Sequence, residues 1–260
     1  MTLHFDCTAC GRCCNALRLP LSIREAIQWL DHGGIVEFDV RRRASLPVSE
    51  TDIAGLFRRE RTFAANSGAL PIRVRLNLVA SFDGPCPNLR PNNLCGAYER
   101  RPATCRIYPA ELRPDADIDP SARLCPPQAW SPDRPLLVRD ARAIVNRGVA
   151  DAVTLARAEG IADVAGKVQL AALLGINVAA LANEGFTIWQ VEGALLRSAL
   201  QEIGAASVPA DPRSPSWIIA SPTPVIRAMI DEAGGAAATV ADLRGASYLA
   251  LQGSIHEPAV

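Results

Sequence analysis

The chain has 260 residues, of which 49% are hydrophobic and 21% are charged, and these proportions are typical of a globular protein rather than a disordered one. Its 27 basic residues balance its 27 acidic residues, so the whole molecule has no electrostatic field that would steer it towards nucleic acid or anionic lipid. We therefore do not expect nucleic acid as a partner.

Three elements are predicted in the first half of the chain. Ser22 and Glu25 form a capping box, and the apolar residues that follow share one helical face as far as Gly33, which predicts a short helix. A weaker helix is predicted over residues 51–61. Apolar residues alternate with others over 72–82, which is the period of a half-buried strand, and the Pro-Asn-Asn turn after it predicts a hairpin or compact loop.

The second half is predicted to be helical. The Pro-rich segment 126–135 is the predicted boundary between a cysteine-cluster metal-binding module, residues 1–130, and a helical region of unknown role, residues 131–260. Helices are expected over 136–159, 164–182, 187–204 and 223–234, with a Pro-rich separator at 209–215. The predicted fold class is α+β and mainly α-helical: an irregular cysteine-rich module with a short β-hairpin, followed by a helical region.

The cysteines are confined to one part of the chain. Eight of them lie in the first 125 residues, and residues 126–260 have none. The chain opens without the basic start and apolar run of a secretory signal, which predicts a cytoplasmic location. Structural disulfides are uncommon in the reducing cytosol, so these cysteines are interpreted as metal ligands or redox groups. The most apolar stretch, residues 164–182, contains several polar residues, and no membrane span is predicted.

The spacing of the cysteines indicates how they bind metal. The first group reads Cys7-x2-Cys10-Gly11-x-Cys13-Cys14, and two-residue spacing lets a tight turn direct two sulfurs at one ion, with Gly11 giving the backbone room. Neighbouring side chains in extended backbone point to opposite sides, so one of the adjacent pair is a candidate ligand of a second ion. The predicted metal ligands are Cys7, Cys10, Cys13, Cys14, Cys86, Cys95, Cys105 and Cys125.

Metal-bound thiolates carry excess negative charge that a protein interior must balance. Arg12, Arg101 and Arg106 each lie within four residues of a cysteine, and two tyrosines lie where they can hydrogen-bond to ligand loops. Pro102 suits the first turn of a short helix that places Cys105 one turn inside. The candidates for supporting the ligands are Arg12, Tyr98, Arg101, Arg106 and Tyr108.

The same residues carry a resemblance to a known family. Residues 7–14 resemble the CxxCxxCC signature of the YkgJ-type cysteine-cluster family of bacteria, whose members are described as zinc- or iron-chelating domain proteins. Residues 85–89 and 95–109, which include Tyr-Glu-x-Arg-Pro and Cys-Arg-x-Tyr-Pro, are similar to the second block of that family. The resemblance covers about residues 5–125. Distant relatives with this cluster include flagellin lysine methylases, so it also implies an iron–sulfur-dependent protein-lysine N-methyltransferase as an alternative function.

The residues leave the metal and the chemistry open. Thiolates suit zinc and iron alike, and Cys7-x2-Cys10-x2-Cys13 matches the opening run of bacterial ferredoxins, although the x3-Cys-Pro continuation is missing. We predict an iron–sulfur cluster or iron as the cofactor, with zinc as the alternative. The predicted function is metal binding at a structural or redox centre, and a zinc-folded protein-interaction module is a further alternative. The predicted partners are the metal ion and a protein partner or protein substrate.

Overall fold

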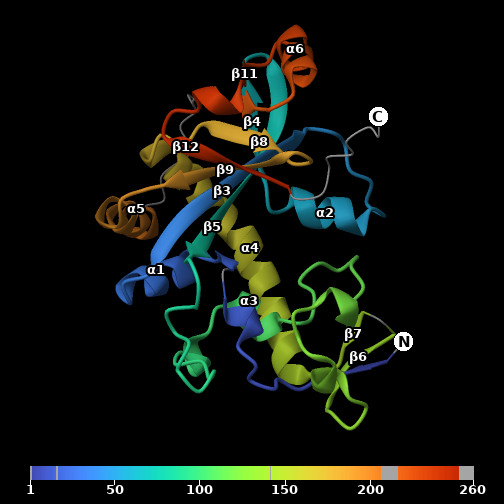
Figure 1. Cartoon of the computed structure of the whole chain (residues 1–260). Coiled ribbons are helices and arrows are strands. Elements are labelled where there is room, and N and C mark those ends of the chain that lie inside the picture. The colour runs from blue at the N-terminus through green and yellow to red at the C-terminus, as the bar shows by residue number, and fades with distance from the viewer. Residues whose placement is uncertain (1, 16, 141, 206–215, 252–260) are drawn as a thin grey trace, which may run out of the picture. The chain divides into compact units, whose positions relative to one another are not determined.

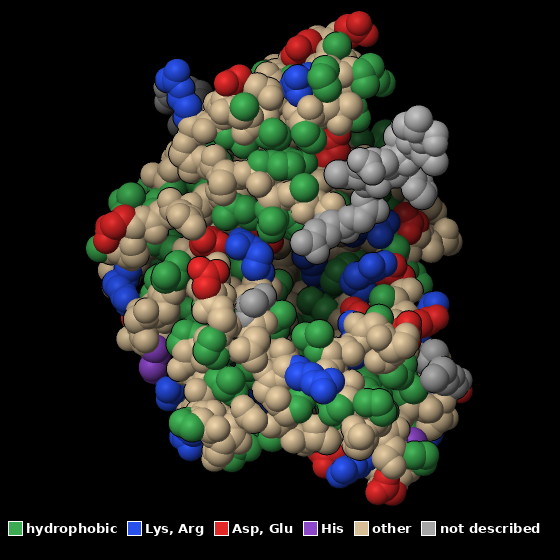
Figure 2. Space-filling model, viewed as in Figure 1, with side chains coloured by type: hydrophobic (Ala, Val, Ile, Leu, Met, Phe, Trp, Pro, Cys, Tyr) green, Lys and Arg blue, Asp and Glu red, His purple; other side chains and the backbone are tan. Residues whose placement is uncertain are grey.

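Figure 1 shows a computed structural model of the chain, which describes residues 2–15, 17–140, 142–205 and 216–251. Among these residues 36% are helical and 27% lie in strands, and nine strands form one large mixed sheet. The prediction of a mainly α-helical fold is therefore wrong, although an α+β fold fits. Side chains of both charges are interspersed over the visible face, as Figure 2 shows.

The chain folds into two compact units, and each is built from separate segments. Unit 1 comprises residues 1–36, 48–60 and 78–163, and unit 2 comprises residues 37–47, 61–77 and 164–260. Three elements contribute residues to both units: the strands β3 (Ile35–Ala44) and β5 (Leu70–Ser81) and the helix α4 (Arg147–Leu173).

Unit 1 consists mostly of short elements. Its strands are β1 (Leu3–His4), β2 (Arg18–Leu21), β6 (Leu136–Arg139) and β7 (Ala143–Ile144), and its short helices are α1 (Ile23–Asp31), α2 (Ile53–Arg59) and α3 (Ala103–Ile107). Single 3-10 turns cover Arg12–Cys14, Tyr98–Arg100, Pro120–Ala122 and Pro127–Trp130. Strands β1, β6 and β7 form a small antiparallel sheet.

A compact apolar core supports this unit. Side chains of the small sheet, of α3 and of the first half of α4 are buried together, including Leu3, Ile107, Val138 and Val153. Fully burying a side chain of this size stabilises a fold by roughly 1.5–3 kcal/mol. The core therefore fixes α3, the helix that carries Cys105, through the buried side chains of Ala103 and Ile107.

Unit 2 contains most of the large sheet. Its strands are β3 (Ile35–Ala44), β4 (Phe63–Ser67), β8 (Val178–Leu181), β9 (Gly185–Gln190), β10 (Ile218–Ala220), β11 (Ala237–Ala238) and β12 (Ala246–Ala250). Helices α5 (Gly193–Ala205) and α6 (Pro224–Glu232) and the 3-10 turn Val240–Asp242 connect them. The strand order is β11-β10-β8-β3-β5-β2, with β9 pairing with both β3 and β12, and β4 pairing with β5. Strands β3, β8, β10 and β11 run parallel, and the central residues of β3, β8 and β10 are buried.

Several local predictions are confirmed. The capping box is present at the start of α1, where the Ser22 side chain accepts from the Glu25 amide and the Glu25 carboxylate accepts from the Ser22 amide. Helix α2 lies within the predicted segment 51–61, and β5 corresponds to the predicted strand 72–82. Helix α6 begins at Pro224, as the Thr-Pro signal indicates.

The predictions for the other helices of the second half are correct only in part: α4 (Arg147–Leu173) and α5 (Gly193–Ala205) lie in the predicted segments, but their bounds differ from those expected. Segment 136–139 is the strand β6, and α4 continues through Gly160 instead of ending there. The apolar run that was expected to be helical to residue 182 ends in the strand β8, all of whose residues are buried. Thr187 was expected to cap a helix, but it lies within the strand β9. Its hydroxyl is within hydrogen-bond distance of two carbonyl oxygens, those of Val40 at 3.2 Å and Val178 at 2.8 Å.

The predicted separator at 209–215 lies outside the described residues. Within the described ranges, no helix combines the length and the hydropathy that crossing a membrane requires.

Candidate metal centre

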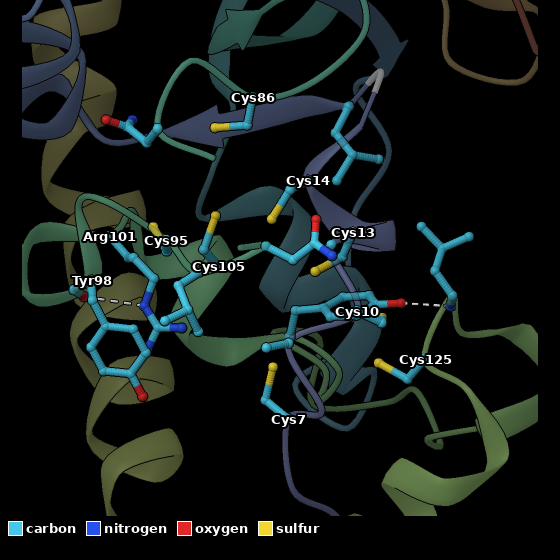
Figure 3. A pocket seen from close by; sticks show the side chains of 18 of the residues that line it. Cys7, Cys10, Cys13, Cys14, Cys86, Cys95, Tyr98, Arg101, Cys105 and Cys125 are labelled. Carbon is cyan, nitrogen blue, oxygen red and sulfur yellow. Dashed lines mark hydrogen bonds between the residues drawn. The ribbon is translucent and has the colours of Figure 1, made fainter. Parts of the chain in front are cut away.

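All eight cysteines line one cavity of about 190 Å³ in unit 1. They approach it from the N-terminal loop, the loop after β5, the helix α3 and the turn before Pro126, and Figure 3 shows their sulfurs around a common space. All of them are free thiols. The sequence prediction placed these residues in one site by their residue type, and the fold brings all of them to one cavity wall.

The first cysteine loop is a turn that depends on glycine. Gly11 has φ +70°, a conformation that L side chains rarely adopt, and it precedes the 3-10 turn that contains Cys13 and Cys14. Its carbonyl oxygen accepts hydrogen bonds from the Cys14 amide at 2.9 Å and from the Asn15 side chain at 2.8 Å. The glycine was expected to allow a tight turn, and its geometry confirms this.

Backbone hydrogen bonds join this loop to the second cysteine block. The Cys86 amide donates to the carbonyl oxygen of Cys14 at 2.7 Å, and a β-bridge pairs Asn15 with Pro85. A second bridge pairs Leu89 with Cys95, so the segment after β5 is a compact loop. These contacts place Cys14 beside a cysteine that lies 72 positions later in the chain.

Helix α3 positions Cys105 and is held by a carboxylate from α1. The Ala103 amide at its first turn donates to Glu25 Oε1 at 2.7 Å, while Glu25 Oε2 accepts from Ser22 at 2.9 Å. Amides in the first turn of a helix have no partner within the helix, and a carboxylate there is stabilising. The capping role of Glu25 was predicted from the sequence, but its contact with α3 was not, because nothing local signals a partner 78 residues away.

The cysteines fall into two sets of four in space. Figure 3 shows Cys7, Cys10 and Cys125 on one side of the space and Cys86, Cys95 and Cys105 on the other, with Cys13 and Cys14 next to each other between them. Electrostatic effects follow this division for the outer thiols: those acting most strongly on Cys125 are Cys10 and Cys7, whereas those acting on Cys105 begin with Cys86 and Cys14. Cys13 and Cys14 act most strongly on each other, so this adjacent pair lies where the two sets meet. The first set is Cys7, Cys10, Cys13 and Cys125, and the second is Cys14, Cys86, Cys95 and Cys105.

The cavity opposes ionisation of its own thiols. Burial, followed by the negative charge of neighbouring thiolates, raises the pKa of Cys105 to about 12. Burial and the adjacent Cys13 likewise raise the pKa of Cys14 to about 12. Burial also raises the pKa of Cys13 and of Cys86. Many thiols in a poorly solvated space cannot all be charged without cations, so the site is suited to cation binding coupled to proton release.

The remaining wall is apolar, with one charged side chain. Arg101 is the single charged residue in it, and carboxylates are absent among its described residues. The guanidinium of Arg101 lies 3.8 Å from the ring centroid of Tyr98, and its Nε donates to the Tyr98 carbonyl oxygen at 3.1 Å. The apolar lining includes Phe5, Leu17, Trp29, Phe82, Leu94 and Leu124, none of which the cysteine spacing predicted.

Three of the five predicted supporting residues lie on the cavity wall: Tyr98, Arg101 and Tyr108. The Tyr108 hydroxyl accepts from the Leu124 amide at 2.7 Å and donates to Cys125, which lowers the pKa of that thiol against the raising effect of burial. Arg12 and Arg106 are absent from the wall, although each is next to a cysteine in the chain. Arg12 is exposed, and Arg106 lines a second cavity.

The donor set fits a thiolate-bound metal, but the thiols surround a space and do not converge on one point. Among the described residues, no three His, Cys, Asp or Glu side chains form a ready single-ion site. The arrangement is wider than the tetrahedron of one zinc ion, in which each sulfur lies about 2.3 Å from the metal.

Comparison with known proteins gives one family match. Residues 6–126 match the model of the CxxCxxCC family, whose description is "Putative zinc- or iron-chelating domain". The match begins one residue before Cys7 and ends one residue after Cys125, so it contains every cysteine of the chain. No curated protein and no solved structure matches the chain.

Proposed function

We propose that residues 6–126, which match the CxxCxxCC family model, hold two metal centres, each bound by four thiolates. The family description supports a general metal-binding role. The observation that carries the finer proposal is the division of the eight thiols into two sets of four around one cavity. In chain order, Cys14 belongs to the first group of four cysteines and Cys125 to the second. In space, Cys125 lies with the first set and Cys14 with the second.

We infer that the centres are iron–sulfur clusters rather than single zinc ions. A cluster spreads its cysteine ligands around several metal and sulfide atoms, and this suits thiols that surround a space of about 190 Å³. When bound, such clusters exchange single electrons, so the role proposed for this domain is a redox one. The methyltransferase and interaction-module alternatives, and the module boundary near residue 130, stay predictions.

The surrounding residues of the chain would balance the charge of the thiolates. Arg101 is held on the cavity wall by Tyr98 and places a cation near the sulfurs. Tyr108 donates a hydrogen bond to Cys125 and so favours the charged form of that ligand.

Anaerobic purification followed by analysis of iron, zinc and acid-labile sulfide, together with a visible spectrum, tests the identity of the metal. We expect a brown protein that contains iron and sulfide. A colourless protein with stoichiometric zinc would overturn the iron–sulfur assignment. The grouping of the thiols would then still be tested by the paired cysteine substitutions.

Paired substitutions test the grouping. If Cys14 and Cys105 bind the same centre, the double variant Cys14→Ser/Cys105→Ser retains about half the metal, as either single variant does. In contrast, Cys7→Ser/Cys14→Ser should lose both centres. Grouping by chain order makes the opposite predictions for these two double variants, so metal content per chain decides between the groupings whichever metal is bound.

A further inference from the structure

Unit 1 contains a second cavity of a different character. It has a volume of about 390 Å³, and no cysteine lines it. Its wall consists of nine residues, seven of which are charged: Arg24, Glu25, Gln28, Glu99, Arg100, Arg101, Arg106, Leu155 and Glu159. Neither the cysteine spacing nor the family description assigns a role to this cavity.

Two of its three carboxylates are already engaged. Both oxygens of Glu25 accept backbone amides, from Ser22 and from Ala103. Glu159 Oε1 accepts from Arg24 Nε at 2.9 Å and from another nitrogen of the same guanidinium at 2.8 Å, so these two opposite charges balance each other, while Glu159 Oε2 has no hydrogen-bond partner among the described residues. The third, Glu99, is exposed.

Three arginines are left with few acceptors. Arg100 is exposed, and Arg101 is stacked on Tyr98. Arg106 is half-buried, and its Nε is enclosed without a hydrogen-bond partner among the described residues. A buried guanidinium without a partner is costly, and a bound anion would offset that cost. The planar fork of arginine donors matches the oxygen geometry of carboxylate and phosphate groups.

We propose that this cavity binds a small oxyanion, the carboxylate or phosphate group of a ligand, through Arg100, Arg101 and Arg106. Arg101 lines both this cavity and the cysteine-lined one, so the bound group lies next to the proposed metal centres. The arginines come from the segment 98–107, which is a 3-10 turn followed by α3, and the anion therefore joins two consecutive short elements.

Isothermal titration calorimetry of the full chain in a phosphate-free chloride buffer tests the proposal, with inorganic phosphate and malonate as the probes. We expect at least one of them to bind with Kd below about 1 mM. Tighter binding of phosphate would identify a phosphate ligand, and tighter binding of malonate a carboxylate ligand. Failure of both to saturate the protein at about 10 mM would overturn the proposal.

Substitutions locate the binding. Arg100→Gln and Arg106→Gln should each weaken binding by about tenfold, because each removes a charge-assisted hydrogen bond. Arg106→Lys keeps the charge but loses the fork, so it should fall between Arg106→Gln and the unchanged protein. The matched control is Arg139→Gln, at an exposed arginine of β6 outside the cavity, which should bind as the unchanged protein does.

Metal content and circular dichroism of each variant separate this proposal from the metal proposal. Loss of anion binding with unchanged metal content supports the anion site. Unchanged anion affinity in the double variant Arg100→Gln/Arg106→Gln overturns it, whatever metal the cysteines hold.

Discussion

The two units use different means to order their backbones. In unit 1 the cavity wall consists of loops, 3-10 turns and the five-residue helix α3, and these present eight thiols together with one cation. Unit 2 has no cysteine, and its parallel strands bury Phe38, Val40, Ile219 and Ala220 completely. The cysteine loops of unit 1 lie outside regular helices and sheets, so metal ligation is the interaction we expect to order these loops, whereas apolar burial orders the second unit.

Removal of the metal should give the largest difference between the units. Because the free energy of ligand binding in such sites is also folding free energy, an anaerobic chelator should destabilise the cysteine loops by on the order of 10 kcal/mol. Hydrogen exchange monitored by mass spectrometry should show lost protection over 86–125 and retained protection in β3 and β10. Equal loss of protection in both units would contradict the expectation that metal ligation orders unit 1 alone.

The substitution Phe38→Ala should have the converse effect. Phe38 lies in β3 with 0% exposure, and truncation of a buried phenylalanine costs about 3–5 kcal/mol through lost burial and a cavity. Urea unfolding should show this loss while metal content per chain stays unchanged. The control is Met229→Ala on α6, where the side chain is 62% exposed and the expected change is within about 0.5 kcal/mol. Loss of metal from the folded Phe38→Ala variant would contradict the expected independence.

The smallest effect is expected at the capping box of α1. Ser22→Ala removes the acceptor for the Glu25 amide and should cost about 1 kcal/mol of unfolding free energy. Ser22→Asp keeps an acceptor and should lie close to the unchanged protein. Hydrogen exchange should increase in α1 and leave β3 unaffected, which would confine the effect to unit 1. An increase in both units would contradict this.

Local sequence signals gave correct predictions where the interactions that form an element lie within that element or next to it. The capping box of α1, the alternation in β5 and the Thr-Pro start of α6 each depend on neighbouring residues, and the structure confirms them. Pro102 precedes the first residue of α3, so Cys105 lies inside that helix as expected.

The failures have two causes: strands that depend on distant partners, and a local signal too weak to end a helix. Segment 178–181 is apolar at every position, and such a run fits a buried helix and a buried strand equally well. It is a strand because β3 and β10 provide parallel partners from positions more than 30 residues away. Gly160 was expected to end a helix, but a glycine within a helix costs only about 1 kcal/mol, and α4 continues through it.

The sequence by itself supplied the candidate donor atoms, the resemblance that the family match supports, and the local turns of the candidate metal site. Only the tertiary structure decided which thiols lie together. Cys13 and Cys14 are adjacent in the chain, yet the hydrogen bond from Cys86 to Cys14 places the second of them with the later block, while Cys125 returns to Cys7 and Cys10. Spacing along the chain limits only how residues a few positions apart can meet. The grouping of the eight sulfurs depends on backbone contacts between segments that are many residues apart.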